Sequence, residues 1–287
     1  KLMKKVTLKD LKVENSYLEL NNKFYDYGTI TPLNHPMIAS KNKLLFDEIG
    51  IDYDNTSNED VIDILNGVEL LNGSLPYAMV YAGHQFGFFV PQLGDGRAIN
   101  IGSYGKHHFA LKGSGITKYS RHGDGKAVLR SSIREYLMSE HLHALGIETT
   151  RALAIISSNH RVYRDMKHEK GSIVLRVSPS WIRFGTFEYY YRNGTKQELE
   201  QLANYVCEQN YTELVNLPRD IKYEKLFFSI MERTAKMIAL WQTYGFMHGV
   251  MNTDNMSVAG LTIDYGPFAF MEEFDKGFVC NLSDKER

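Results

Sequence analysis

A polar stretch near the end of the sequence, His248 to Asn255 (HGVMNTDN), sets the strongest condition on the fold. Nine residues after Asn255 stands Asp264, the first residue of the tripeptide Asp-Tyr-Gly. Mg²⁺ prefers hard oxygen ligands and few carboxylates, so one Asn and one Asp on two short loops are a minimal set for a Mg²⁺ that carries nucleotide phosphates. The pattern predicts metal ligands at Asn255 and Asp264, in a fold that places the two loops together.

The spacing of this stretch matches that of protein kinases. Their catalytic loop opens with His-Arg-Asp, the metal-binding Asn lies seven residues after the His, and Asp-Phe-Gly follows on the next hairpin. His248 and Asn255 are also seven residues apart, but the kinase base position is Val250, which cannot accept a proton, and a carboxylate stands instead at Asp254. We therefore expect kinase-like metal chemistry with a relocated base. The alternative is a polar turn followed by a helix cap at Asp264.

Short apolar runs broken by glycines fill residues 79–115. Gly94-Asp95-Gly96 stands between an apolar run and the alternating residues 98–101, a pattern that predicts a hairpin with a glycine turn. Lys112, 18 residues after Gly94, ends the next predicted strand. Kinase-like folds lay backbone amides and one ammonium against phosphates in this way. The plainer alternatives are a hairpin without a ligand and a solvated lysine.

A helix is predicted from Val128 to Leu145, because apolar residues recur there at helical spacing and Gly146 ends the pattern. Glu135 lies early in this helix, 23 residues after Lys112. A buried strand lysine needs a carboxylate from a packed helix to stay charged and directed at a phosphate. We therefore predict an ion pair between Lys112 and Glu135. The alternative is a glutamate on the surface.

Two further groups of charged residues are candidate anion contacts. Asp124 and Gly125 belong to a mixed-charge loop at the start of the predicted helix, a position that suits an anion. Arg176 lies on a predicted strand and Arg183 follows seven residues later, so that the two can clamp a triphosphate through bidentate bonds. A solvated turn and ordinary surface charges are the alternatives, and the local sequence does not decide between them.

Composition and charge argue against nucleic-acid and membrane partners. Its 287 residues carry a formal net charge of -1, which gives no basic field, so we expect no nucleic-acid partner. Cys207 and Cys280 are the two cysteines, and their spacing indicates neither a disulfide framework nor a zinc site. No apolar run reaches the length of a membrane span and the first residues do not resemble a secretory signal. We expect a cytoplasmic protein with no membrane partner.

The order of elements predicts an α+β chain with a protein-kinase-like two-lobe fold. Residues 1–78 are expected to form an N-terminal arm and helices that pack on the core, including a helix from about Pro36 to Glu48. Residues 79–185 form the first lobe, with the glycine turn, the strand lysine and the glutamate helix. Residues 186–287 begin a helical second lobe that holds both polar motifs. Since a kinase-like lobe needs more helices after the metal hairpin, we expect this lobe to be incomplete and the chain to be a fragment.

Local signals place helix starts in two other regions. Ser57 with Asp60 resembles a capping box before an apolar run, and Thr195 with Glu198 repeats this pattern. A further helix is predicted over residues 223–244, ahead of Gly245.

Longer strings carry a family resemblance from about Tyr17 to the end of the chain. YAGHQFG, QLGDGR, LKGSG, SRHGDGKAVLRSSIRE, SWIRFGTFE, HGVMNTDNMS and GLTIDYGPF closely resemble the selenoprotein O family. Its members are kinase-like pseudokinases that act as protein AMPylases, which are nucleotidyltransferases. The resemblance implies ATP bound in reversed orientation, so that AMP is transferred to Ser, Thr or Tyr hydroxyls of protein substrates. It also implies Mg²⁺ as the cofactor, with Mn²⁺ as a substitute, and we expect a monomer.

The resemblance also implies roles for individual residues. Asp254 matches the general base, and Asn255 and Asp264 match the Mg²⁺ ligands. The expected nucleotide contacts are Gly94, Gly96, Arg97, Lys112 with its partner Glu135, Asp124, Gly125, Arg176, Arg183 and, through the metal, Asp264. The family's C-terminal redox Cys or selenocysteine motif lies outside this sequence, and Cys280 does not match it.

Two other functions compete with AMP transfer. An ordinary kinase would transfer the γ-phosphoryl group, but Val250 occupies the position of its base. A non-catalytic nucleotide-binding scaffold is the alternative from another class, since fold does not imply activity. The combination of Asp254, Asn255 and Asp264 argues against a scaffold, which does not need all three.

Overall fold

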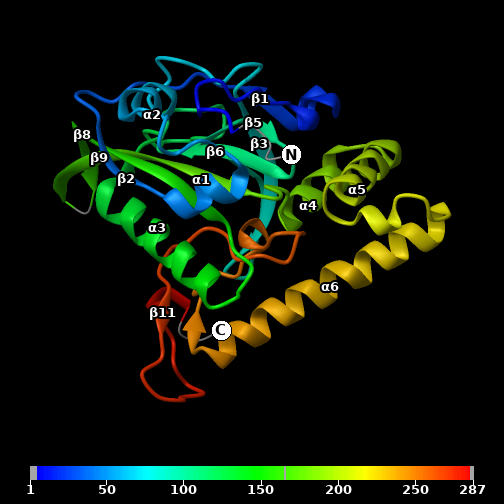
Figure 1. Cartoon of the computed structure of the whole chain (residues 1–287). Helices are drawn as coiled ribbons and strands as arrows, with labels where there is room; N and C mark the ends of the chain where they lie inside the picture. The colour runs from blue at the N-terminus through cyan, green and yellow to red at the C-terminus, as the bar shows by residue number, and fades with distance from the viewer. Residues whose placement is uncertain (1–4, 165, 285–287) are drawn as a thin grey trace. The chain divides into compact units, whose positions relative to one another are not determined.

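The computed structural model of this α+β chain describes residues 5–164 and 166–284 (Figure 1). Within these residues, nine strands form one sheet in the order β1-β3-β5-β6-β9-β8-β2, with β4 paired to β3 and β7 to β9. The strands are β1 Tyr25–Tyr27, β2 Met37–Lys41, β3 Tyr77–Gln85, β4 Phe88–Gly94, β5 Ala98–Tyr104, β6 His107–Lys112, β7 Ala127–Val128, β8 Arg151–Arg164 and β9 Lys167–Ser178. The helices are α1 Lys43–Ile49, α2 Asn58–Leu65, α3 Leu129–Ala144, α4 Phe184–Asn193, α5 Lys196–Asn210 and α6 Arg219–Thr243.

The chain divides into two compact units. The first contains the residues up to Val80 together with Gly94–Glu140 and Arg151–Ser178. The second contains Tyr81–Leu93, His141–Thr150 and the residues from Pro179 onward. The predicted N-terminal arm therefore belongs to the same unit as most of the predicted first lobe. Among the helices of the described part of the chain, none is long and apolar enough to cross a membrane.

The core of the first unit joins the sheet to the N-terminal residues. Leu8 and Leu11 are fully buried in one cluster with Phe46 of α1, Val61 of α2 and Leu175 of β9. Burial of a leucine or phenylalanine side chain stabilises a fold by roughly 1.5 to 3 kcal/mol. The predicted arm is thus an integral part of this core.

The helix predicted from about Pro36 to Glu48 is wrong over its first residues. Met37–Lys41 is instead β2, which pairs antiparallel with β8. Helix α1 begins after Asn42, whose Oδ1 accepts a hydrogen bond from Leu45 N at 3.2 Å, and it ends at Gly50 with φ of +87°. Sheet pairing satisfies the backbone of residues 37–41, and the helix starts later than predicted because Asn42, and not a residue before Pro36, is its N-cap. The Ser57 cap is confirmed, since Ser57 Oγ accepts from Asp60 N.

The hairpin predicted at Gly94-Asp95-Gly96 is also wrong. Strand β4 pairs with β3 and the turn that joins them is Phe86-Gly87, with φ of +49° and +84°. The glycines at 94 and 96 lead instead into β5, and each packs against Tyr119. A Cβ on Gly94 would lie 2.5 Å from the Tyr119 ring, and one on Gly96 would lie 2.9 Å from its carbonyl oxygen. Close packing within the first unit therefore accounts for both glycines.

Two helices predicted from local sequence patterns are present in the second unit. The capping box of α5 is confirmed, because Thr195 Oγ1 accepts from Glu198 N at 3.2 Å and Glu198 Oε2 accepts from Thr195 N at 2.6 Å. The predicted helix over 223–244 is present as α6, which begins at Arg219. After α6, the short strands β10 (Phe246–Met247) and β11 (Ala269–Phe270) pair antiparallel. The chain between these strands contains both polar motifs, so their pairing holds the two motifs in one loop region.

Candidate functional site

His248 joins the two polar motifs within the second unit. Its Nε2 donates to the carbonyl oxygen of Ile263 at 2.8 Å, and its Nδ1 accepts from Val250 N at 3.3 Å. The ring stacks on Trp241 with centroids 5.4 Å apart. Burial lowers the pKa of His248 below its usual range. The residue therefore acts as a neutral link between the loop that carries Asp254 and the segment that carries Asp264.

Replacing His248 by Gln is expected to flatten the pH dependence of stability. Below the unfolded pKa near 6.5, the unfolded chain binds a proton that native His248 does not, so stability falls as pH drops toward the lower folded pKa. The slope in that window reaches about 1.4 kcal/mol per pH unit for one proton. Urea unfolding between pH 7.5 and 5.5, followed by tryptophan fluorescence, measures it. His248→Gln should lose this slope and the exposed control His122→Gln should keep it, whereas equal slopes would contradict the assignment.

Within the part of the chain that the structure describes, one carboxylate oxygen of Asp254 has a hydrogen-bond partner and the other has none. The residue is 7% exposed, and its Oδ2 accepts from Gln85 Nε2 at 2.8 Å. Its Oδ1 is buried and has no hydrogen-bond partner within the described residues. Burial raises the pKa of Asp254, while the Gln85 bond and the charge of Arg183 act in the opposite direction. A carboxylate with a raised pKa and an unused lone-pair oxygen is suited to accept a proton from a substrate hydroxyl.

The end of β3 forms one wall around Asp254. His84 N donates to Thr253 Oγ1 at 2.8 Å, and Phe86 N donates to Asn252 Oδ1 at 3.3 Å. A Cβ on Gly83 would lie 2.6 Å from Asp254 Oδ1, so a side chain at position 83 would displace the Asp254 carboxylate. These contacts fix the Asp254 loop against the backbone of a strand far away in the sequence.

A glutamate on α4 completes this wall. Glu188 Oε1 lies 2.7 Å from His84 Nδ1, and Glu188 Oε2 accepts from Thr253 Oγ1 at 2.7 Å. Gln85, His84 and Glu188 are not among the site residues predicted from the sequence. A signal existed for the first two, because YAGHQFG places polar side chains at the end of an otherwise apolar strand. Glu188 has no comparable signal.

Arg183 connects the Asp254 loop to Asp264. Its Nη1 donates to the Asp264 carboxylate and also to the carbonyl oxygen of Asp254 at 2.5 Å. Its guanidinium lies over the Tyr81 ring, 4.6 Å from the centroid. Asp264 has a left-handed backbone with φ of +58°, which costs a non-glycine residue roughly 1 to 3 kcal/mol. Such a conformation is typical of functional positions, and here it directs the carboxylate toward Arg183.

The oxygen donors near Arg183 fit a Mg²⁺ ion. Asn255 Nδ2 donates to Val250 O at 3.1 Å, and this orientation leaves the amide oxygen as a possible ligand. Asp264 supplies one carboxylate, while no group of three His, Cys, Asp or Glu side chains in residues 5–164 and 166–284 is arranged to hold a metal. Mg²⁺ is typically held by one or two protein oxygens together with waters and substrate phosphates. Asn255 and Asp264 stay the predicted ligands of a Mg²⁺ ion that substrate phosphates and waters would also bind.

The first unit contains the predicted lysine and glutamate pair. Lys112 Nζ forms an ion pair with Glu135 Oε2, and Arg176 Nη1 lies 3.5 Å from Glu135 Oε1. Strand β6 pairs with β9 so that Ala110 is opposite Arg176, which puts Lys112 and Arg176 on the same face of the sheet. The half-buried Lys112 and the buried Arg176 thus share one helix carboxylate. Arg176 and Arg183, the predicted clamp, each pair with a carboxylate in their own unit.

The predicted anion loop has contacts of its own within the first unit. Asp124 accepts from Arg164 at 2.9 and 2.5 Å, and hydrogen bonds from this guanidinium hold the pKa of Asp124 below its usual range. Lys126 Nζ donates to Thr31 O at 2.8 Å. Gly125 has φ of +68°, and a Cβ there would lie 2.0 Å from the Gly115 carbonyl oxygen.

The backbone of the remaining predicted contact, Arg97, is also engaged. Its carbonyl oxygen accepts from Gly113 N at 2.7 Å, and its side chain is exposed. The contacts of Gly94, Gly96, Asp124 and Gly125 suffice to explain those residues structurally. Their nucleotide contacts, and that of Arg97, stay predictions.

Comparison with known proteins agrees with the motifs. The family described as protein adenylyltransferase SelO matches residues 7–287. A protein nucleotidyltransferase YdiU of Thioalkalivibrio sulfidiphilus is 46% identical over 282 residues, which are 96% of this chain and 57% of the relative. The YdiU proteins of Thiobacillus denitrificans and Stutzerimonas stutzeri are 46% and 44% identical, over 97% of this chain and 57% and 58% of their own lengths. The chain thus spans less than three fifths of the length of these relatives.

Proposed function

The chain belongs to the protein adenylyltransferase SelO family, and from this premise we propose that it transfers AMP from ATP to Ser, Thr or Tyr hydroxyls of other proteins. One observation supports this function above an ordinary kinase. A buried carboxylate oxygen of Asp254 is unpartnered within the described residues, beside the Asp264 loop, whereas the kinase base position is the apolar Val250. We propose with it a kinase-like two-lobe organisation for the full-length protein.

In the proposed reaction, Asp254 Oδ1 accepts the proton of the substrate hydroxyl. The hydroxyl oxygen attacks the α-phosphorus of ATP, a new P–O bond forms, and the bond between the α-phosphorus and the bridging oxygen breaks to release pyrophosphate. Gln85 holds Oδ2 and so fixes the direction in which Oδ1 points. Because burial raises the pKa of Asp254, its carboxylate is a stronger base than one in water.

Nucleotidyl transfer depends on positioning and charge neutralisation more than on covalent chemistry of the protein. Asn255 and Asp264 would hold Mg²⁺, which neutralises charge on the phosphates when it is bound. In the first unit, Lys112 is a proposed phosphate contact, and Glu135 keeps its ammonium charged and oriented. Arg176 and Arg183 are the proposed contacts of the pyrophosphate.

The function is tested with ATP labelled at the α or the γ phosphate. The full-length protein is incubated with Mg²⁺ and protein substrate, and label that becomes attached to protein is measured. Incorporation from the α label alone is the expected result. Incorporation from the γ label alone would make the protein a kinase. Binding of ATP without incorporation of either label would favour the scaffold.

A further inference from the structure

A closed ring of hydrogen bonds joins three elements of the second unit beside Asp254. His84 N, at the end of β3, donates to Thr253 Oγ1 at 2.8 Å, and the Thr253 hydroxyl donates to Glu188 Oε2 at 2.7 Å. The other oxygen of Glu188 lies 2.7 Å from His84 Nδ1. An ionised carboxylate can only accept, so His84 Nδ1 is the donor in this last bond. The side chain that closes the ring is therefore Glu188.

The short helix that contains Asp254 depends on contacts from outside itself. Thr253–Asn255 is a single 3-10 turn, and its N-cap residue Asn252 makes no side-chain bond to it. The Asn252 Oδ1 atom accepts instead from Phe86 N. One turn of helix is not stable by itself, because nucleation costs more than its first hydrogen bonds return. The position of Asp254 is therefore set by the residues of β3 and α4 that hold this turn.

Helix α4 holds two consecutive residues of the turn with side chains of opposite charge. Arg183, its N-cap residue, donates to the carbonyl oxygen of Asp254 at 2.5 Å. Glu188, five residues later, accepts from the hydroxyl of Thr253. A Cβ on Gly185 would lie 2.0 Å from a carbonyl oxygen of β3, so the start of the helix packs directly on that strand. The helix thus provides a fixed support for the loop that carries the proposed base.

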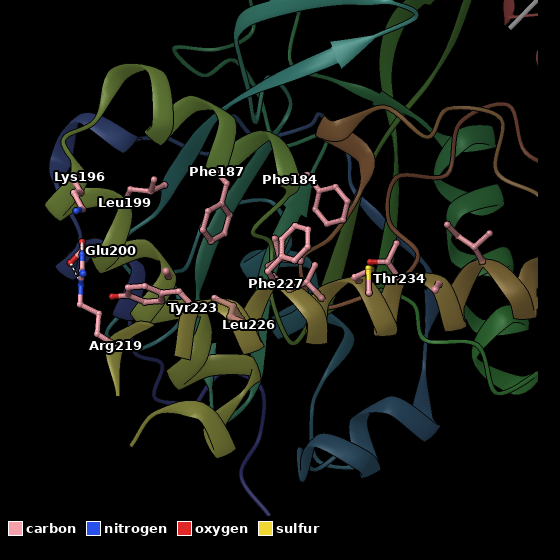
Figure 2. Close-up of a pocket in the computed structure, with 16 residues that line it drawn as sticks. Phe184, Phe187, Lys196, Leu199, Glu200, Arg219, Tyr223, Leu226, Phe227 and Thr234 are labelled. Carbon is pink, nitrogen blue, oxygen red and sulfur yellow. Dashed lines mark hydrogen bonds and ion pairs between the residues drawn. The ribbon is translucent and has the colours of Figure 1, made fainter. Parts of the chain in front are cut away.

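The packing of α4 keeps Glu188 in place at this junction. Figure 2 shows the rings of Phe184 and Phe187 at a groove of about 850 Å³ among α4, α5 and α6, and Glu188 is not part of its lining. Thr186 and Tyr190 are buried, one on each side of Glu188 in the sequence. Glu188 itself has a side chain that is 23% exposed. It is therefore a largely buried carboxylate on a packed helix, directed at the loop of the proposed base.

We propose that Glu188 is a positioning residue for the general base and acts on it through Thr253. In this role it holds the backbone of the turn, while Gln85 holds one carboxylate oxygen of Asp254. Both are needed to keep Oδ1 where it can accept the proton of the substrate hydroxyl. A misplacement of about 1 Å can slow a reaction by roughly 100-fold. This inference rests on the proposed function, because it assigns a residue to the same reaction.

A double-mutant cycle with the full-length protein tests the proposal. Incorporation from α-labelled ATP is measured for the wild type, Glu188→Ala, Asp254→Asn and the double variant. Glu188→Ala alone should slow transfer by about 10- to 100-fold, with the affinity for Mg²⁺ and ATP unchanged in calorimetry. In the Asp254→Asn background the same change should cost less than about twofold, because no base is left to position. An equal loss in both backgrounds would show a structural role alone and overturn the proposal.

Conservative variants provide a second readout that does not depend on the cycle. Glu188→Gln keeps an oxygen for the Thr253 hydroxyl, and Thr253→Ser keeps that hydroxyl, so both should stay close to the wild-type rate. Thr253→Val has a similar shape without the hydroxyl and should be as slow as Glu188→Ala. Glu208→Ala, at an exposed glutamate of α5, is the control and should keep the wild-type rate.

The outcomes separate this role from the function on which it rests. If the wild type incorporates no α label, the proposed function fails and the role of Glu188 fails with it. If the wild type is active and either Glu188→Ala or Thr253→Val is equally active, the positioning role alone is overturned.

Discussion

Replacing Asp264 by alanine is expected to reduce Mg²⁺-dependent AMP transfer by about three orders of magnitude or more, with the fold retained. A bound metal contributes several kcal/mol to the stabilisation of charge in a transition state, and each 1.36 kcal/mol changes the rate about tenfold. Without Asp264, the amide oxygen of Asn255 is left as the one protein ligand of the proposed pair. Arg183 also loses the carboxylate that it binds.

The measurement is the rate of incorporation from α-labelled ATP across a range of Mg²⁺ concentrations, with thermal unfolding as a check of the fold. Glu272→Ala, at an exposed acidic residue a short distance along the chain, is the matched control and should keep the wild-type rate. Asp264→Asn should recover little activity, since an amide oxygen is a weak substitute for a carboxylate on Mg²⁺. Full activity in Asp264→Ala would remove the metal role assigned to this residue.

Features set by neighbouring residues could be predicted from the sequence. The caps at Ser57 and Thr195 depend on contacts three residues apart, and both are present. The pairing of Lys112 with Glu135 joins residues further apart, but the kinase pattern already relates a strand lysine to a helix carboxylate. Local chemistry and a known spacing were sufficient in these cases.

Features that depend on contacts between residues far apart in the sequence were predicted wrongly or missed. Residues 37–41 were predicted to belong to one helix with the α1 residues, because Pro36 precedes and Gly50 follows this segment. Their backbone instead pairs with β8, more than a hundred residues later. Gln85 was missed for a similar reason, since its partner Asp254 lies 169 residues away. Cross-strand and loop contacts of this length leave no periodic signal in the sequence.

The glycines at 94 and 96 show how one residue type supports two interpretations. A glycine allows a phosphate to approach the backbone, and it equally allows a neighbouring chain to pack closely. The structure shows the second use, against Tyr119, and this contact alone requires glycine at both positions. A role for Gly94 or Gly96 at a nucleotide therefore needs evidence beyond the motif.

Changing Asp254 to asparagine is expected to slow AMP transfer by about 10² to 10⁴-fold, the usual contribution of a positioned general base. Asparagine keeps the shape of the side chain and an oxygen that can accept from Gln85, so the loop should be preserved. Gln85→Ala should have a smaller effect, because the base remains and only its orientation is released. The order of rates should be wild type, then Gln85→Ala, then Asp254→Asn.

Binding and transfer must be measured separately, because Asp254 is next to the proposed metal ligand Asn255. Calorimetry should give Asp254→Asn the wild-type affinity for Mg²⁺ and ATP, while incorporation from α-labelled ATP falls. A parallel loss of affinity would show that the variant disturbs the metal ligands and leaves the base unidentified. A wild-type rate would exclude Asp254 as the base. A selective loss of rate would place proton acceptance at the carboxylate whose Oδ1 is buried and unpartnered in the described part of the chain.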